Sequence, residues 1–391
     1  MDPNEGTGGV CRDFPADVLG NILTRLPANA RRLLRLVCRH WRDVVGTRTA
    51  TNLRSRAKTL VAATGYAYVV DDLSNPPPVR QQRQLWSGID NARQYEAMNI
   101  IGTCNGLVCL CDSGGAITVA NPVTGEALAI PPLPLPAPGK VNSRSWHEGY
   151  SFAYLPTTRR YKVVHVPCWV NGTAFKTLQV ITLGEAPWRD VPAEPAVKSY
   201  NGYGVVSVDG SVYWAAKSEH AEKVMSLDLE DERVAPITSL PSVLSNPKDV
   251  DGWHLAEVHG RLGIVVGPIW STGVWVMERA PGRGEEISWS RWYIMQLCTP
   301  PYQCLTWPLF VHGEHVLAWQ PRLYGQGCVL YSLTLIRDDD VSKAKRGVVD
   351  IGDTAEWSFV ATYHDMTSLS SYSRTFGYVE TKEPLSVFKI S

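Results

Sequence analysis

The chain has 391 residues, 44% of them hydrophobic and 19% charged, so it can build large cores, and its length suggests two domains. No apolar run approaches the ~20 residues that a membrane span requires, so we expect no membrane partner. The first ten residues lack the apolar segment of a secretory signal. The nine cysteines are therefore expected to be free thiols in a reducing compartment, and we expect the cytoplasm or the nucleus.

The net charge is zero, but the charges are unevenly placed. Residues 1–60 hold eleven Lys and Arg against five acids, a net of +6, and the remainder carries −6. This basic N-terminal segment makes nucleic acid a candidate partner. Because these arginines alternate with apolar residues, the favoured interpretation is the solvated side of helices, with no nucleic acid bound.

The first predicted element is helical and follows a tail, residues 1–12, that we expect to be disordered. Val18, Leu19, Ile22, Leu23 and Leu26 have the spacing of one helix face. Pro15 suits a first helical turn, and Pro27 ends the helix. A second helix, capped by Asn29, repeats apolar residues at Leu33, Val37 and Trp41, flanked by Leu34, Cys38 and Val45. These short helices are too small for an independent core, so they either pack on the following domain or dock another protein.

The order of these residues resembles an F-box. The matching positions are Pro15, Asp17, Leu19, Ile22, Leu23, Leu26, Pro27, Val37, Cys38, Trp41 and Arg42. Phe14 stands where Leu is usual, and Arg31 and Arg32 stand where the family has apolar residues. The resemblance implies an F-box over residues 13–58 that binds the Skp adaptor of a cullin-type ubiquitin ligase. The implied adaptor-binding residues are Phe14, Pro15, Val18, Leu19, Ile22, Leu23, Leu26, Pro27, Leu33, Leu34, Val37, Cys38 and Trp41.

From Leu60 onward the sequence changes to short runs rich in Val, Ile, Tyr and Trp, separated by turn residues. The runs include LVAATGYAYVV, GLVCLC, YKVVHV, SVYWAA and CVLYSLTL. Asp209-Gly210, His259-Gly260 and His312-Gly313 each predict a hairpin between two apolar runs. The pattern predicts an all-β domain.

Roughly 23 candidate strands are too many for an ordinary sandwich, and radial repetition solves the edge problem for so many strands. Blades of ~40–50 residues predict about six to seven blades over residues 59–391. The expected fold is thus a multidomain α+β chain: a small helical domain followed by an all-β propeller. We expect Trp188, Trp214, Trp253, Trp275 and Trp292 between blades.

A second resemblance supports this fold. The phrase CNGLVCLCDSGGAITVANPVTGEALAIPPLP, residues 104–134, resembles the start of the plant F-box-associated domain, and SFAYLPTTRRYKVVHV, VDGSVYWAAK, VMSLDLEDERV and GVWVMER follow in the family's order. It implies a β-propeller-like domain that recognises substrates. The phrases TFGYVET and LSVFKI are candidate strands that close the ring.

Candidate chemistry is sparse. Cys104, Cys109 and Cys111 suggest a metal site, but no matching CxxC or His spacing completes it, and buried strand residues are the better interpretation. His312 and His315 flank a predicted turn. No nucleophile, metalloprotease or phosphate-loop motif appears, so we expect no catalytic residue, metal or cofactor.

The sequence therefore predicts a non-catalytic substrate receptor of a Skp–cullin–F-box ligase. The adaptor, and through it a cullin, would be its partners, together with a target protein whose binding residues stay unknown. The alternative is a propeller enzyme or sugar-binding propeller with a structural helical cap. His and carboxylate side chains that converge at the central channel would favour this alternative.

Overall fold

The computed structural model describes part of the chain. The described residues are 15, 18–19, 22, 41, 58–63, 66–71, 73, 82–87, 99–112, 115–133, 149–155, 157–167, 175–185, 187–199, 204–217, 222–237, 240–245, 253–258, 260–266, 271–279, 287–296, 298–299, 303–304, 309–310, 315–321, 328–334, 349–351, 358–363 and 374–388.

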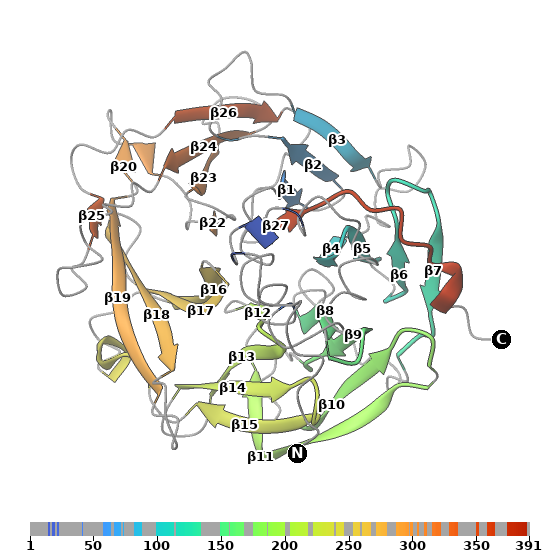
Figure 1. Cartoon of the computed structure of the whole chain (residues 1–391). Helices are drawn as coiled ribbons and strands as arrows, with labels where there is room; N and C mark the ends of the chain where they lie inside the picture. Colours follow the sequence, from blue (N-terminus) through green and yellow to red (C-terminus); the bar gives the residue numbers. More distant parts are fainter. Residues whose placement is uncertain are drawn as a thin grey trace, which may run out of the picture. The chain divides into compact units, whose positions relative to one another are not determined.

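The chain divides into two compact units, Met1–Ala57 and Lys58–Ser391. In the first unit, Val18, Leu19, Ile22 and Trp41 have helical backbone. The second unit is a mostly-β propeller, whose sheets surround a common axis in Figure 1.

Three sheets begin the ring; in the first two the strands are given from the axis outward, and in the third they are given in chain order. The first contains β27 (Arg374–Tyr378), β1 (Lys58–Ala63), β2 (Tyr66–Val70) and β3 (Gln82–Ser87). The second contains β4 (Asn99–Cys104), β5 (Leu107–Cys111), β6 (Ile117–Ala120) and β7 (Ala127–Ile130). The third has eight strands: β8 (Tyr150–Leu155), β9 (Arg160–His165), β10 (Phe175–Thr182), β11 (Arg189–Ser199), β12 (Val205–Val208), β13 (Ser211–Lys217), β14 (Glu222–Asp228) and β15 (Arg233–Ile237).

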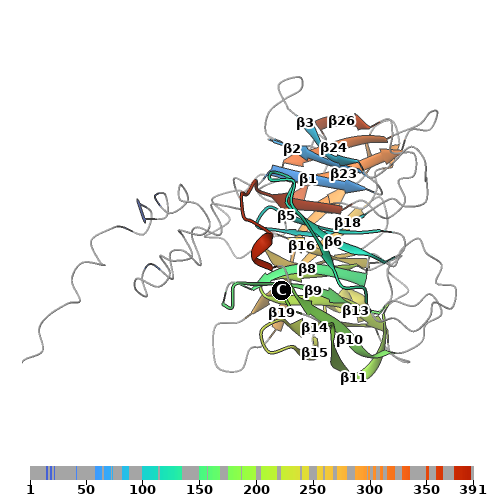
Figure 2. The same cartoon turned by 90° about the vertical axis from the view of Figure 1, so that its right-hand side faces the viewer.

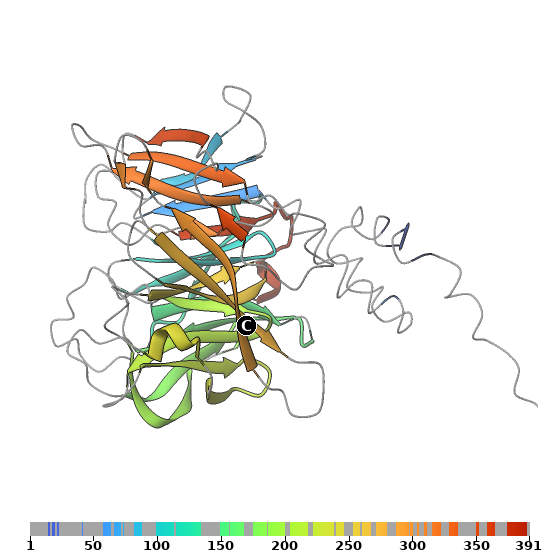
Figure 3. The same ribbon diagram turned by 90° about the vertical axis from the view of Figure 1, so that its left-hand side faces the viewer.

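Two further sheets complete the ring, and Figure 3 views it from the side of β18 and β19. One contains β16 (Trp253–Val258), β17 (Arg261–Val266), β18 (Ser271–Arg279), β19 (Ile287–Gln296) and β25 (Val349–Ile351). The other contains β22 (Leu309–Phe310), β23 (His315–Pro321), β24 (Cys328–Thr334) and β26 (Ser358–Tyr363). A separate pair joins β20 (Cys298–Thr299) to β21 (Gln303–Cys304), and 3-10 helices span Ser242–Ser245 and Ser386–Phe388.

The predicted count of six to seven blades is not confirmed, because the described strands form five sheets of four or more strands. The difference lies in the eight-stranded sheet. Its two runs of four strands are joined where the last residues of β11, Lys198 and Ser199, pair with Lys217 and Ala216 of β13. The long strand β11 thereby belongs to both runs, a pairing that strand counting in the sequence does not reveal.

The last strand closes the ring on the first. β27 pairs antiparallel with β1, from Lys58 opposite Tyr378 to Ala62 opposite Arg374. The guanidinium of Arg374 also donates to the carbonyl oxygens of Val205 on β12 (2.7 Å) and Ile101 on β4 (3.4 Å). Closure therefore joins residues from both ends of the unit, as the phrase TFGYVET predicted.

The two ends of the ring differ in their connections. We call one end the turn face: it carries the tight turns β4–β5, β12–β13 and β14–β15, the start of β1 and the end of β27. The opposite end, where β4, β8, β12, β16 and β27 begin, is the loop face. Figure 2 shows the C-terminal segment, in red, following the turn face past β5 to the last 3-10 helix.

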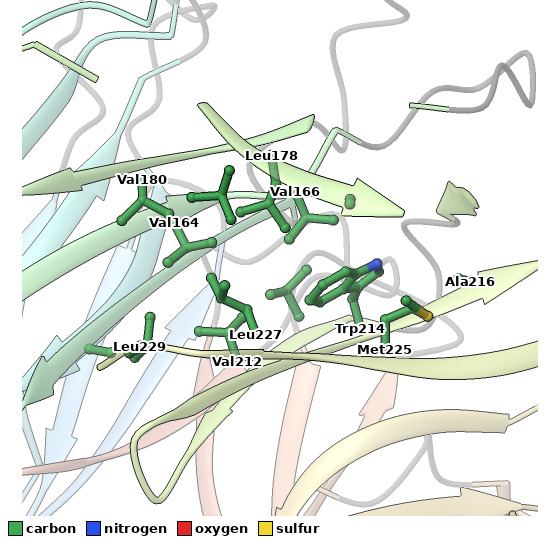
Figure 4. Close-up of a cluster of buried hydrophobic side chains, with 14 of the residues drawn as sticks. Val164, Val166, Leu178, Val180, Val212, Trp214, Ala216, Met225, Leu227 and Leu229 are labelled. Carbon is green, nitrogen blue, oxygen red and sulfur yellow. The ribbon is translucent and has the colours of Figure 1, made fainter. Parts of the chain in front are cut away.

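Buried side chains fill the spaces between neighbouring sheets. One cluster, drawn in Figure 4, packs Val164, Leu178 and Val180 against Val212, Trp214 and Leu227, which joins the two runs of the eight-stranded sheet. The five tryptophans predicted between blades lie in such clusters: Trp188, Trp214 and Trp253 are buried, and Trp275 and Trp292 are half-buried.

Local sequence signals correspond to most of the described strands, with two corrections. The run LVAATGYAYVV is not one strand, because β1 and β2 form a hairpin around residues 64–65. The phrase LSVFKI does not supply a closing strand, because Ser386–Phe388 is a 3-10 helix. The Asp209-Gly210 hairpin is confirmed, with φ of 48° and 76°, and His312-Gly313 lies outside the described residues.

Candidate functional site

The predicted adaptor face is described at five positions. The N–H of Leu19 donates to the carbonyl of Pro15 (3.0 Å), which is one helical turn. The Leu19 side chain is buried, whereas Val18 and Ile22 are 46% and 45% exposed. Pro15 is exposed and Trp41 half-buried. The other predicted positions lie outside the described residues: Phe14, Leu23, Leu26, Pro27, Leu33, Leu34, Val37 and Cys38.

Val18 and Ile22 are therefore aliphatic side chains four residues apart on helical backbone, a spacing that places them side by side. Both remain in contact with water although the neighbouring Leu19 is buried. This helical turn therefore carries one buried and two exposed aliphatic side chains.

The Asn-Gly phrase forms the β4–β5 turn. Asn105 and Gly106 have φ of 51° and 83°, the positive values that a two-residue hairpin turn requires. A Cβ on Gly106 would lie 2.3 Å from the carbonyl oxygen of Val379. The glycine thus lets the chain after β27 cross the turn at close range.

The Asn-Pro-x-Thr-Gly-Glu phrase forms the β6–β7 turn and binds the same C-terminal segment. Asn121 Oδ1 accepts the N–H groups of Val123 (2.9 Å) and Thr124 (3.3 Å), which fixes the turn. Its Nδ2 donates to the carbonyl of Glu383 (2.9 Å), and the carboxylate of Glu126 accepts the N–H of Leu385 (3.0 Å).

We call residues 379–388 the strap, because they tie three sheets of the turn face together. Asn105 Nδ2 donates to the hydroxyl of Tyr161 (3.0 Å), and that hydroxyl donates to Glu383 Oε2 (3.0 Å). Leu385 is fully buried in the cluster around Tyr161, and Phe388 meets the Tyr161 ring edge-on, with centroids 5.6 Å apart. The phrases that resemble the F-box-associated domain therefore hold the strap in place.

Charged side chains join the eight-stranded sheet at the same face. The buried ammonium of Lys162 donates to Glu232 (2.7 Å) and to the carbonyl of Leu229 (2.5 Å). Glu232 also accepts Arg189 (2.6 Å), and Glu185 accepts both Arg189 and Arg160. Burial works against ionisation of Glu232, but hydrogen bonds from Arg189 and Lys162 outweigh it and lower the pKa of this carboxyl.

The cysteines flagged by the sequence are packing residues. Cys109 and Cys111 are buried on one strand, and Cys104 donates to the carbonyl of Phe152 (3.4 Å). Burial raises the pKa of the Cys104 thiol to about 12 and that of Cys109 well above its ordinary value. Within the described residues no three His, Cys, Asp or Glu side chains gather to hold a metal ion.

The strand β16 brings His254 and Glu257 to the innermost position of its sheet. Burial lowers the pKa of His254 to about 4, so this imidazole is neutral near pH 7. These are the only His and carboxylate side chains of the described innermost strands. In the described part of the chain, no helix is long and apolar enough to cross a membrane.

Comparison with known proteins identifies both units. Residues 12–49 match the F-box domain model, and residues 74–331 match the F-box associated beta propeller domain model. The F-box protein At3g07870 of Arabidopsis thaliana is 23% identical over 74% of this chain and 74% of its own length. The Arabidopsis thaliana protein At5g52610 is 25% identical over 70% of this chain and 76% of its own length.

Among solved structures, the Cps50 (Swd1) beta-propeller domain of Myceliophteria thermophila is 11% identical, with a TM-score of 0.36 over 80% of this chain and 87% of that one. The domain match over residues 74–331 covers more than half of the chain. The chain belongs to the family of F-box proteins that carry an F-box associated beta propeller domain.

Proposed function

We propose that this chain is the substrate-recognition subunit of a Skp–cullin–F-box ubiquitin ligase. The observation that carries the proposal is the presence, on one chain, of an F-box match at residues 12–49 and a propeller match at residues 74–331. Residues 13–58 would bind the Skp adaptor and, through it, a cullin, whereas residues 59–391 would hold a target protein.

The chain supplies no reacting group in this role. It raises the effective concentration of target lysines beside a charged ubiquitin-conjugating enzyme, so its contribution to the rate is proximity. Such a receptor works in the cytoplasm or the nucleus, where the thiols of Cys104, Cys109 and Cys111 stay reduced.

The adaptor would contact the exposed apolar pair of Val18 and Ile22, while the buried Leu19 holds the unit together. The remaining contacts proposed are Phe14, Pro15, Leu23, Leu26, Pro27, Leu33, Leu34, Val37, Cys38 and Trp41. Desolvated aliphatic side chains at the centre of an interface typically dominate its affinity.

The test is co-purification of the full chain with a Skp adaptor for wild type and Ile22→Asp. A buried, unpaired carboxylate at the interface costs several kcal/mol, so Ile22→Asp should abolish adaptor binding. Val387→Asp is the matched control, since Val387 is 68% exposed in the propeller unit, and it should bind like wild type. Equal adaptor binding by Ile22→Asp, with circular dichroism unchanged, would refute the proposed contact, and failure of the wild type to bind would refute the ligase role.

A further inference from the structure

The strap lies on the propeller without joining any of its sheets. None of the described residues 379–388 belongs to a strand, and the strap begins where the last strand, β27, ends at Tyr378. Figure 2 shows this segment, in red, following the turn face. Release of the strap would therefore break no strand ladder, and the ring that β27 closes on β1 would remain.

Two side chains of the β6–β7 turn bind the main chain of the strap. Asn121 Nδ2 donates to the carbonyl oxygen of Glu383 (2.9 Å), and the carboxylate of Glu126 accepts the N–H of Leu385 (3.0 Å). Recognition of this kind supplies affinity for a peptide through its backbone and leaves specificity to pockets for its side chains. The propeller therefore holds the strap in the way that a receptor holds a bound peptide.

Three side chains of the strap supply the specific contacts. Glu383 Oε2 accepts the Tyr161 hydroxyl (3.0 Å), Leu385 is fully buried, and Phe388 meets the Tyr161 ring edge-on. The side chains between and before these anchors are exposed: Glu380, Lys382, Pro384, Ser386 and Val387. The contact pattern is thus an acidic residue, a leucine two positions later and an aromatic residue three positions after the leucine.

The turn that receives the strap is fixed by bonds of its own. Asn121 Oδ1 accepts the N–H groups of Val123 (2.9 Å) and Thr124 (3.3 Å), and the Thr124 hydroxyl donates to the carboxylate of Glu126 (3.3 Å). None of these bonds involves the strap. Asn121 and Glu126 would therefore keep their positions if the strap left.

The aromatic part of the site is likewise built by the ring. The Tyr161 side chain packs against Phe152 and Tyr154, with ring centroids 5.5 and 4.8 Å apart. Asn105 Nδ2 donates to the Tyr161 hydroxyl (3.0 Å). Because these contacts come from β4–β5, β8 and β9, departure of the strap would leave a formed site, as is usual for ligand-binding sites.

We propose that the turn face carries a peptide-binding site, formed by Asn121, Glu126 and Tyr161, and that the strap is its resident ligand. In exchange for the strap, the site binds a segment of a partner protein that has the strap's contact pattern of acid, leucine and aromatic residue. The strap competes with that segment from within the same chain, so the site opens only to a partner that displaces it. This inference does not depend on the ligase role, because it uses no residue of the first unit.

The experiment measures binding of a fluorescently labelled peptide, residues 379–388, to the full chain by fluorescence anisotropy. Leu385→Asp in the chain should release its strap, because burial of an unpaired carboxylate is costly. The peptide should bind this variant at least about tenfold more tightly than wild type, whose own strap competes at an effective concentration on the order of 1 mM or higher. Equal binding to the two chains, or binding to neither, would overturn the inference.

Val387→Asp in the chain is the matched control, because Val387 is 68% exposed. It places the same carboxylate in the strap without disturbing a buried contact, so the peptide should bind this variant as weakly as it binds wild type. Tight binding to Val387→Asp would show that any added charge promotes association, and it would contradict the assignment of Leu385 as the anchor.

Variants of the peptide test the proposed chemistry on the Leu385→Asp chain. Peptides carrying Leu385→Asp or Phe388→Ala should bind about tenfold or more weakly, since each loses an anchor, whereas Val387→Ala should bind like the unaltered peptide. Glu126→Ala in the chain should also weaken binding about tenfold, because the Leu385 N–H loses a charged acceptor. Equal binding by all of these peptides would refute the proposed contact pattern.

Circular dichroism and tryptophan fluorescence show whether Leu385→Asp keeps the fold of the propeller. If it does not fold, Phe388→Ala in the chain takes its place, because this change weakens the strap without placing a charge in the core. The peptide should bind Phe388→Ala more tightly than wild type. Affinity equal to that of wild type would then refute exchange at this site.

Discussion

Replacing Leu385 by Ala should destabilise the propeller far more than replacing Val387 by Ala, although both residues lie in the strap. Leu385 is fully buried in the cluster that contains Tyr161 and Ile181, whereas Val387 is 68% exposed. Truncating a buried Leu removes apolar contacts and leaves a cavity, which costs 2–5 kcal/mol, about 3 kcal/mol in the middle of that range. An exposed substitution changes the free energy of unfolding by about 0.5 kcal/mol or less.

Urea unfolding followed by tryptophan fluorescence suits this comparison, because thirteen of the fourteen tryptophans lie after residue 57 and report on the propeller unit. The unfolding midpoint of Leu385→Ala should fall clearly below that of wild type at an unchanged slope. Hydrogen exchange should also rise at the amide of Leu385, which donates to the carboxylate of Glu126. Identical midpoints for Leu385→Ala and Val387→Ala would refute the conclusion that the strap is part of the propeller core.

Two further outcomes follow from the turn face and the sheet that carries His165. Gly106→Ala should lower the free energy of unfolding by at least about 1–2 kcal/mol more than Gly125→Ala. Both glycines have positive φ, so both variants carry backbone strain, but only a Cβ at position 106 would strike Val379, since no atom lies within 4 Å of a Cβ at position 125. Equal urea midpoints for the two variants would contradict this. Burial, which outweighs a hydrogen bond to Gln179, lowers the pKa of His165 to about 4 from an ordinary 6.5. As the pH falls, His165 therefore takes up its proton in the unfolded chain before it does so in the folded chain. The contribution of His165 to the free energy of unfolding is complete above pH 6.5 and should decline by about 3 kcal/mol as the pH falls to 4. The free energy of unfolding of His165→Gln, measured by urea titration at each pH, should fall correspondingly less over that range. A pH dependence equal to that of wild type would argue against a buried, neutral His165.

Much of the local structure could be predicted from the sequence because its causes are local. The Asp209-Gly210 hairpin follows from the positive φ that these residues adopt readily. The strand runs from GLVCLC to CVLYSLTL follow from β-branched and aromatic composition. Buried positions for Trp188, Trp214 and Trp253 follow from the apolar area of their rings.

The candidate sites were predicted unevenly. The F-box order of residues indicated Val18 and Ile22, but not that they are exposed while Leu19 is buried, because helical spacing alone does not tell which apolar residues face a unit's own core. Residues 104–134 were matched to the plant F-box-associated domain, but the bonds from Asn121 to Glu383 and from Leu385 to Glu126 join residues more than two hundred positions apart.

What the sequence by itself determined is the all-β class of the propeller unit, several of its turns and most described strands, since backbone preference and side-chain alternation act over a few residues. What only the tertiary structure decided is the closure of β27 on β1, the joining of β11 to β13, and the splitting of LVAATGYAYVV into two strands. It also decided which connections share a face. These features depend on pairing between segments that are distant in the sequence. The free energy of that pairing comes from burying both surfaces together, so the residues of one segment alone do not predict it.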